Sequence, residues 1–193
     1  MNTELEAKFL DIDAASIREK LHAVGAVLAY PERLMKRNNF DFSDLRLEKI
    51  GGWVRVRDEG DKVTLSYKQV NHRGFTGTQE IEMAVDSYKS ACDFLVALGL
   101  EKKSYQETRR EKWALGNCEV TIDTWPWIPT TLEIEGPTED EVKASATQLG
   151  LPWSNALHGD IAIAYARDFD IEEQAVYHHN NFSFDAPCPW RRR

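Results

Sequence analysis

The sequence predicts an α+β protein built on an antiparallel sheet of eight strands, a number that can close into a barrel. Eight short segments alternate apolar and charged residues with the period of two that a β-strand requires. Turn signals separate several neighbouring segments, which favours hairpins over parallel crossovers. Stretches with helical spacing interrupt this series. The expected strands cover residues 3–9, 34–42, 52–58, 62–69, 78–84, 104–113, 117–123 and 130–135.

The turns and helices follow from local signals along the chain. Glu59-Gly60-Asp61 is expected to join the third and fourth strands, and Gly116-Asn117 the sixth and seventh. Each expected helix follows a residue able to cap its first turn and stops at a glycine. The three helices therefore lie between Asp13 and Gly25, between Asp86 and Gly99, and between Thr138 and Gly150.

The C-terminal region carries weaker signals. Residues 159–174 have apolar side chains at helical spacing, whereas residues 175–193 contain two prolines and read as weakly ordered. We expect one domain over residues 1–170 and a C-terminal tail over residues 171–193. A chain of 193 residues with 42% hydrophobic residues is long and apolar enough to build such a domain.

Composition excludes several classes of protein. No apolar run approaches the roughly 20 residues of a spanning helix, and the N-terminus lacks the pattern of a secretory signal, so no membrane association is expected. Three cysteines without C-x-x-C spacing suggest neither a disulfide framework nor a zinc site. This use of cysteine favours a reducing, cytoplasmic location. With 24 Lys and Arg against 32 Asp and Glu, the formal net charge of −8 argues against a nucleic-acid partner.

Every expected strand except 34–42 carries a charged face opposite an apolar one. In an open sheet the charged face would meet water, which is the commoner arrangement. In a closed barrel with its apolar face outward, the charges would line a lumen, where they must pair or bind a ligand. A divalent metal bound to a polyphosphate suits carboxylates and cations around one cavity. The charged faces contain Glu4, Glu6, Lys8, Arg55, Arg57, Lys62, Lys68, Glu80, Glu82, Glu107, Arg109, Glu111, Glu119, Asp123, Glu133 and Glu135.

Several motifs follow one another in a fixed order along the chain. They are Glu4-Leu5-Glu6-Ala7-Lys8, Trp53-Val54-Arg55-Val56-Arg57, Leu65-Ser66-Tyr67-Lys68, Gln79-Glu80-Ile81-Glu82, Arg109, Thr121-Ile122-Asp123 and Leu132-Glu133-Ile134-Glu135-Gly136. This ordered series resembles the CYTH superfamily of triphosphate tunnel metalloenzymes, which includes class IV adenylate cyclases, thiamine triphosphatases and inorganic tripolyphosphatases. The resemblance covers roughly residues 2–170 and implies an eight-stranded tunnel with helices packed outside.

The resemblance also implies roles for individual residues, with Mg²⁺ or Mn²⁺ as the cofactor. Lys68 and Glu6 would be catalytic, and Glu80 and Glu82 would hold the cations in place or reach a metal through water. The metal ligands would be Glu4, Glu6, Asp123, Glu133 and Glu135. The triphosphate would be bound by Lys8, Arg55, Arg57, Lys68 and Arg109.

Two positions depart from the pattern of this superfamily. Asn39 stands where hydrolytic members commonly have a tyrosine that is thought to work with the lysine matching Lys68, and an amide is neither an acid nor a base. Glu107 stands where a cation is expected two residues before Arg109. Strict alternation would place the nearby Arg110 and Lys112 on the opposite face of that strand.

The aromatic segment Trp125-Pro126-Trp127-Ile128-Pro129 joins the last two expected strands near the tunnel. It can serve as a hydrophobic lid over one end of the barrel, or it can stack on an aromatic ring of the substrate.

The expected function is a metal-dependent hydrolysis of a small-molecule triphosphate, such as tripolyphosphate, a nucleoside triphosphate or thiamine triphosphate. Conversion of ATP to cyclic AMP and pyrophosphate is the close alternative. A non-catalytic module that binds polyphosphate or nucleotides is the alternative from another class. By analogy with the superfamily, the protein is expected to form a homodimer.

Overall fold

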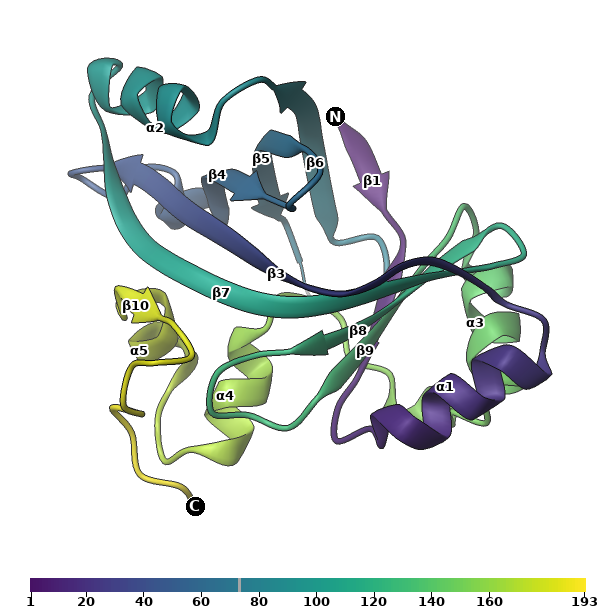
Figure 1. Ribbon diagram of the computed structural model, residues 1–193. Helices are drawn as coiled ribbons and strands as arrows, with labels where there is room; N and C mark the ends of the chain where they lie inside the picture. The colour runs from purple at the N-terminus through teal and green to yellow at the C-terminus, as the bar shows by residue number, and fades with distance from the viewer. Residues whose placement is uncertain (73) are drawn as a thin grey trace.

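The strands form one sheet that curls almost into a closed barrel (Figure 1). The computed structural model describes residues 1–72 and 74–193. Nine strands follow one another in the order β1-β6-β5-β4-β3-β7-β8-β9-β2, and all these neighbours are antiparallel. They are β1 (Asn2–Glu4), β2 (Glu6–Phe9), β3 (Val27–Phe42), β4 (Gly52–Asp58), β5 (Val63–Val70), β6 (Thr78–Val85), β7 (Leu100–Leu115), β8 (Cys118–Thr124) and β9 (Thr131–Glu135).

The N-terminal strand brings the two ends of the sheet together. Its first part, β1, pairs with β6, and its second part, β2, pairs with β9, with only Leu5 between them. The Leu5 carbonyl accepts a hydrogen bond of 3.1 Å from the Gly136 amide. Because one continuous segment supplies both edges, the expected barrel of eight strands is confirmed, with the first strand divided in two.

The helices cover the outside of the barrel. Figure 1 shows α1 (Ala14–Ala23) and α3 (Glu139–Gln148) together at one side, and α2 (Tyr88–Ala97) at the other. Apolar side chains of β2, β8 and β9 pack with α1 and α3, while Phe40 and Val56 pack with α2. Since the apolar faces of the strands point outward to the helices, the opposite faces point into the barrel.

Capping side chains begin these three helices. Asp13 accepts a hydrogen bond of 3.1 Å from the Ala15 amide, and Thr138 accepts one of 3.3 Å from the Glu141 amide. The cap of α2 is Ser87 rather than the expected Asp86, and Ser87 accepts from the Ser90 amide. The remaining short elements are η1 (Glu48–Ile50), η2 (Trp153–Asn155), α4 (Ala162–Asp168), α5 (Glu173–Tyr177) and β10 (Asn181–Phe182).

Two strands are longer than the alternation predicts. β3 begins at Val27 instead of residue 34, and β7 spans Leu100–Leu115 instead of residues 104–113. Irregular pairing between Leu28 and Arg33 accompanies the first extension, where Pro31 lacks the amide hydrogen that a regular ladder requires. This irregularity hides the strand from a search for strict alternation.

The C-terminal residues pack on the barrel. Residues 159–174 contain α4 and the start of α5 rather than one helix, because the backbone is extended at Phe169. β10 pairs in parallel with β7, and Phe182 is only 2% exposed within a cluster that includes Tyr165 and Trp190. The segment 175–193 is therefore more ordered than its composition predicts. The division at residue 170 stays a prediction.

Within the described part of the chain, no helix has the length and apolar character needed to span a membrane.

Candidate functional site

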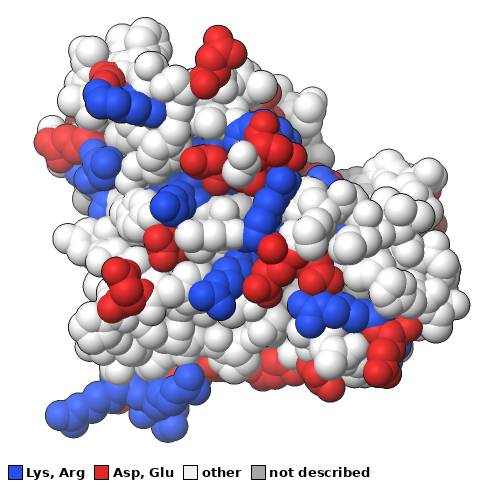
Figure 2. Space-filling model, viewed as in Figure 1, with Lys and Arg blue, Asp and Glu red and all other residues white. Residues whose placement is uncertain are grey.

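The inward faces of the strands surround a cavity of about 640 Å³. Residues that pair across antiparallel strands share a face, so Lys68 points to the same side as Glu80, and Lys8 to the same side as Glu133. Figure 2 shows acidic and basic side chains interleaved across the middle of the visible face. Asp123 and Arg109 do not line the cavity. The lining includes the other sequence-predicted site residues, namely Glu4, Glu6, Lys8, Arg55, Arg57, Lys68, Glu80, Glu82, Glu133 and Glu135.

Two arginines of β4 lie on one wall of the cavity. The Nη2 atom of Arg55 lies 3.1 Å from Glu80 Oε1 and 3.6 Å from Glu82 Oε2. Arg57 Nη2 lies 2.6 Å from Oε1 of Glu59, which is itself buried. Burial and the neighbouring Arg57 lower the pKa of Arg55 to about 10. Glu80 and Glu82 thus pair with the guanidinium of Arg55, which burial has removed from most of its contact with water.

Lys68 on β5 is held between two carboxylates. Its ammonium donates to both oxygens of Glu4, at 2.6 and 2.9 Å, and lies 3.4 Å from Glu80. These contacts join β5 to β1 and β6 across the closing edge of the barrel. They fix the amino group inside the cavity, where charge-assisted hydrogen bonds are strong.

A second network crosses the opposite wall. Lys8 lies 2.6 Å from Glu6 and 3.3 Å from Glu133. Arg110 lies 3.0 Å from Glu133 and binds both oxygens of Asp123, at 2.6 and 2.5 Å. Burial opposes the ionisation of Glu133, but Lys8 and Arg110 outweigh it and hold the pKa of Glu133 well below its usual range. Asp123 is fully buried, and burial raises its pKa against the effect of Arg110.

A row of carboxylates crosses three strands at one end of the barrel. Glu6 on β2 pairs with Glu135 on β9, which pairs in turn with Glu119 on β8. Desolvation and the charges of Glu4, Glu6 and Glu119 raise the pKa of Glu135 to about 7. Negative charge therefore exceeds positive charge around Glu135.

The oxygen donors of this row suit a hard divalent cation, and the raised pKa of Glu135 marks a position where a cation would relieve repulsion. In the structure Glu4 pairs with Lys68 and Glu6 pairs with Lys8, so both carboxylates already have a cationic partner. Among residues 1–72 and 74–193, no three acidic, His or Cys side chains are arranged as a metal site. The donor set fits a metal by its chemistry, and binding one requires these lysines to exchange partners.

The expected face of β7 was wrong. Arg109 is exposed, and its guanidinium lies 4.6 Å from the ring of Phe184, outside the barrel. The inward cation is Arg110, which pairs in register with Asp123. The buried Trp113 lies four residues after Arg109 on the same face of the strand and packs in the outer core, which places the odd-numbered positions from Tyr105 to Leu115 outside. That apolar signal was available in the sequence and was overlooked.

The outward placement also explains the apparent loss of a cation at Glu107. Glu107 accepts hydrogen bonds from the hydroxyl of Tyr105 and the amide of Phe184, at 2.7 and 3.0 Å, on the outer surface. Arg110 and Lys112 supply the cations of this strand to the cavity instead.

Sequence reasoning missed Arg37 on β3. Arg37 and Asn39 line the cavity, whereas Asn38 and Phe40 pack outward against α2 and its neighbours. The alternation of Arg37, Asn39 and Asp41 against Asn38 and Phe40 was present, but two adjacent asparagines obscured it. Asn39 therefore lies at the cavity.

Trp125 lies at the boundary between the cavity and a buried aromatic cluster. It is 5% exposed, lines the cavity and packs with Ile128 and Tyr165. Its partner Trp127 turns away into the C-terminal cluster, where its indole donates to the Ala186 carbonyl at 3.0 Å. The aromatic segment between β8 and β9 thus lies between the cavity and the C-terminal cluster.

The structure is thus a barrel with helices outside and with both cations and carboxylates lining its cavity. The family model for the CYTH domain matches residues 2–160, and the chain belongs to this family. None of the curated proteins searched matches the chain.

Solved structures with the same fold share little sequence with this chain. A protein of Vibrio parahaemolyticus described as a candidate adenylate cyclase has a TM-score of 0.76 at 14% identity, covering 86% of this chain and 98% of its own. The PH1012 protein of Pyrococcus horikoshii has a TM-score of 0.66 at 20% identity, covering 79% and 93%. A protein of Hippeastrum described as a candidate adenylyl cyclase with a dominant triphosphatase activity has a TM-score of 0.59 at 14% identity, covering 90% and 94%.

Proposed function

We propose that this protein is a metal-dependent enzyme that binds a linear triphosphate inside its barrel and hydrolyses it. The observation that carries the proposal is the convergence on one cavity of Lys8, Arg55, Lys68 and Arg110, which come from separate strands and each lie beside a carboxylate. Family membership supports triphosphate chemistry, and the Hippeastrum structure supports hydrolysis within this fold. Phosphoryl transfer needs positioning and charge neutralisation more than covalent catalysis, which suits such a site.

The cations would bind the phosphate oxygens. Arg55 and Arg57 offer planar donors to the chain from β4, while Lys68 and Lys8 approach from the other strands. Arg110 takes the place that the sequence assigned to Arg109. Their carboxylate partners keep these groups extended into the cavity before the substrate arrives, which lowers the ordering cost of binding.

The acidic row would hold the divalent metal. Glu4, Glu6 and Glu135 offer the accessible oxygens, and Glu133 joins them from beside Lys8. Asp123 supports Arg110, because both of its oxygens are taken by that guanidinium. When bound, Mg²⁺ or Mn²⁺ would supply positive charge at the phosphate oxygens.

In hydrolysis, a water oxygen forms a bond to the terminal phosphorus while the bond from that phosphorus to the bridging oxygen breaks. We assign Lys68 to the charge that develops on the leaving phosphate oxygens, and Glu6 to the proton of the attacking water. The contact of 2.6 Å from Lys8 to Oε1 of Glu6 orients this carboxylate in the cavity, and the other oxygen would accept the proton. Asn39 cannot take part in proton transfer.

Cyclisation of ATP is the second candidate, and the apolar part of the cavity lining supports it. Apolar side chains of Trp53, Ile161 and Val176 line the cavity beyond the charged residues and offer room for an organic group. In that reaction the ribose 3′-oxygen would attack the α-phosphorus, and pyrophosphate would leave.

One assay tests these reactions together. The purified protein is incubated with Mg²⁺ or Mn²⁺ and, in turn, with tripolyphosphate, ATP and thiamine triphosphate, and orthophosphate, pyrophosphate and cyclic AMP are measured. Orthophosphate release that stops with EDTA supports hydrolysis, and equal release of cyclic AMP and pyrophosphate from ATP supports cyclisation. Tight binding of triphosphate without any product would contradict an enzyme and favour a binding module.

A further inference from the structure

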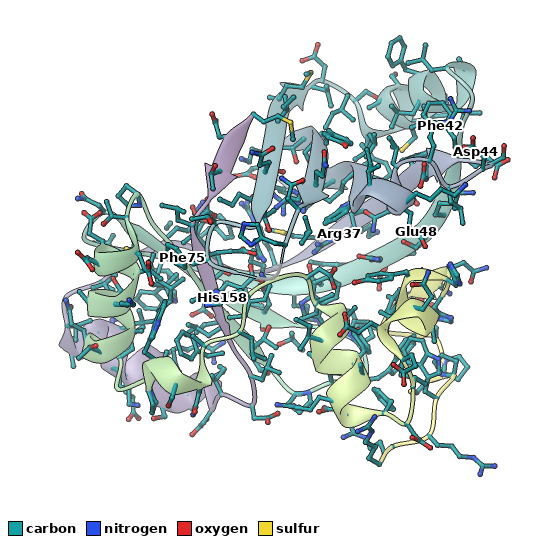
Figure 3. All side chains as sticks on the ribbon, turned by 180° about the vertical axis from the view of Figure 1, so that it is seen from behind. Arg37, Phe42, Asp44, Glu48, Phe75 and His158 are labelled. Atoms are coloured by element: carbon teal, nitrogen blue, oxygen red, sulfur yellow. The ribbon has the colours of Figure 1, made fainter. Side chains whose placement is uncertain are left out.

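Arg37 is a buried guanidinium without an acidic partner. The residue is 6% exposed, and Figure 3 places it near the middle of the molecule. Its Nη2 atom donates to the hydroxyl of Thr108 at 2.6 Å, and its guanidinium carbon lies 4.6 Å from the centre of the Trp125 ring. Its Nε atom has no hydrogen-bond partner. Among the carboxylates of residues 1–72 and 74–193, none lies within 4.0 Å of its nitrogens.

The neighbouring arginines are balanced differently. Arg55 is paired with Glu80, Arg57 with Glu59, and Arg110 with Asp123 and Glu133. Arg37 pairs in register with Arg57 on β4, so two guanidinium side chains leave adjacent strands on the same face. Burial, and then the charges of Arg55, Arg57 and Arg110, lower the pKa of Arg37 well below its usual range and outweigh the opposing charge of Asp123. Positive charge is therefore in excess around Arg37.

Unpaired polar atoms continue across the neighbouring strands. Asn39, Arg55 and Ser66 form one cross-strand row on β3, β4 and β5. Each has a buried polar atom without a partner, namely Asn39 Oδ1, Arg55 Nε and Ser66 Oγ. Asn39 and Arg55 of this row line the cavity, and because buried polar groups are nearly always satisfied in folded proteins, their unpaired atoms are available to a polar ligand there.

We propose that Arg37 is a substrate-binding residue that contacts a phosphoryl group of the triphosphate and completes a cluster of guanidinium groups on this wall of the cavity. The proposal rests on the proposed function. It adds a cation that lies in none of the sequence motifs. This cation comes from the expected strand 34–42, for which no charged face was predicted. The ring of Trp125 and the hydroxyl of Thr108 hold the guanidinium in place, and the anion supplies the negative charge that the protein does not.

This arrangement has a consequence for stability. An unpaired buried charge destabilises the free protein, whereas a bound anion turns the same charge into a favourable contact. Replacing Arg37 by a neutral residue of similar length should leave the free protein as stable as wild type or more stable, while weakening substrate binding. A merely structural arginine would show the reverse, with lost stability and unchanged binding.

The test compares Arg37→Met with Arg109→Met, a control that removes an outward arginine. Binding of tripolyphosphate with MgCl2 is measured by calorimetry, and thermal unfolding is recorded with and without the ligand. We expect Arg37→Met to weaken binding about 10- to 100-fold, the effect of losing a charged hydrogen bond, without lowering the melting temperature of the free protein. Arg109→Met should bind within about 2-fold of wild type, since a contact outside the barrel does not reach the ligand.

Two further outcomes keep the test decisive. Arg37→Lys retains a charge and should recover part of the lost affinity, and it serves in place of Arg37→Met if that variant does not fold. If Arg37→Met binds tripolyphosphate as tightly as wild type, this inference alone is overturned. If only Arg37→Lys folds, wild-type binding by that variant overturns it. A wild-type protein that does not bind tripolyphosphate overturns the proposed function first and this inference with it.

Discussion

Replacing Arg110 with methionine tests which face of β7 lines the barrel. The change removes the guanidinium that binds both oxygens of Asp123 and also contacts Glu133. Methionine keeps a similar length without the charge. The matched change, Arg109→Met, removes the same charge from the next position of the strand, where the guanidinium rests on Phe184.

The burial of the two carboxylates sets the expected magnitude. The side chain of Asp123 is fully buried and that of Glu133 is 16% exposed, so Arg110→Met leaves buried negative charge without its main partner. Breaking a buried pair in this way costs about 3–5 kcal/mol. For a chain of this size each kcal/mol shifts the melting temperature by about 2–4 °C, which predicts a loss of about 6–20 °C. Arg109→Met should cost less than about 1 kcal/mol.

Thermal unfolding followed by circular dichroism at neutral pH measures both variants beside wild type. The deficit of Arg110→Met should shrink as the pH falls, because protonation then neutralises the buried carboxylates of Asp123 and Glu133 that the variant leaves without this partner. Equal stability of the two variants, or a greater loss for Arg109→Met, would refute the assignment of the even-numbered residues from Gln106 to Lys112 to the interior.

Further expected results concern three residues, Glu135, Arg57 and Phe182. The pKa of Glu135 is about 7 in the folded protein, whereas a glutamate of the unfolded chain loses its proton near 4.5. The free energy of unfolding should therefore fall as pH rises from about 4.5 to 7, and Glu135→Gln should remove this pH dependence in urea unfolding. Metal-dependent activity should rise over pH 6–8 as Glu135 ionises, and a flat profile with wild-type metal affinity would contradict its role. Arg57→Ala should raise KM at least about 10-fold with tripolyphosphate, since a charged contact is lost; an unchanged KM argues against its phosphate role. Phe182→Ala should cost about 3–5 kcal/mol in urea unfolding, because its fully packed ring holds the C-terminal segment, and a neutral result would show that this segment is dispensable.

Much of the fold could be predicted because apolar and charged residues alternate cleanly along most strands. In β4, Val54 and Val56 alternate with Arg55 and Arg57, and the same regularity in β8 and β9 fixes which side faces the helices. Alternation alone did not show whether the charged face of the sheet points outward to water or inward to a lumen. The resemblance to a tunnel family indicated the lumen.

The errors occurred where two phases of alternation compete. In β7 both Arg109 and Arg110 are charged, so the strand offers a charged face in either phase, and only the buried Trp113 decides between them. In β3 the adjacent Asn38 and Asn39 hide the inward Arg37. The C-terminal segment was underestimated because its order comes from tertiary packing of Phe182 and Trp190 rather than from local propensity.

The central claim is that a triphosphate and its metal bind inside the barrel. Crystals grown with tripolyphosphate and Mn²⁺ test it directly, because the anomalous signal of manganese locates the metal independently of the phosphate. We predict manganese at the row that contains Glu6 and Glu135, with phosphate oxygens against Arg55 and Arg57. Manganese and phosphate bound only on the outer surface, with an empty cavity in a protein that releases phosphate in solution, would contradict it.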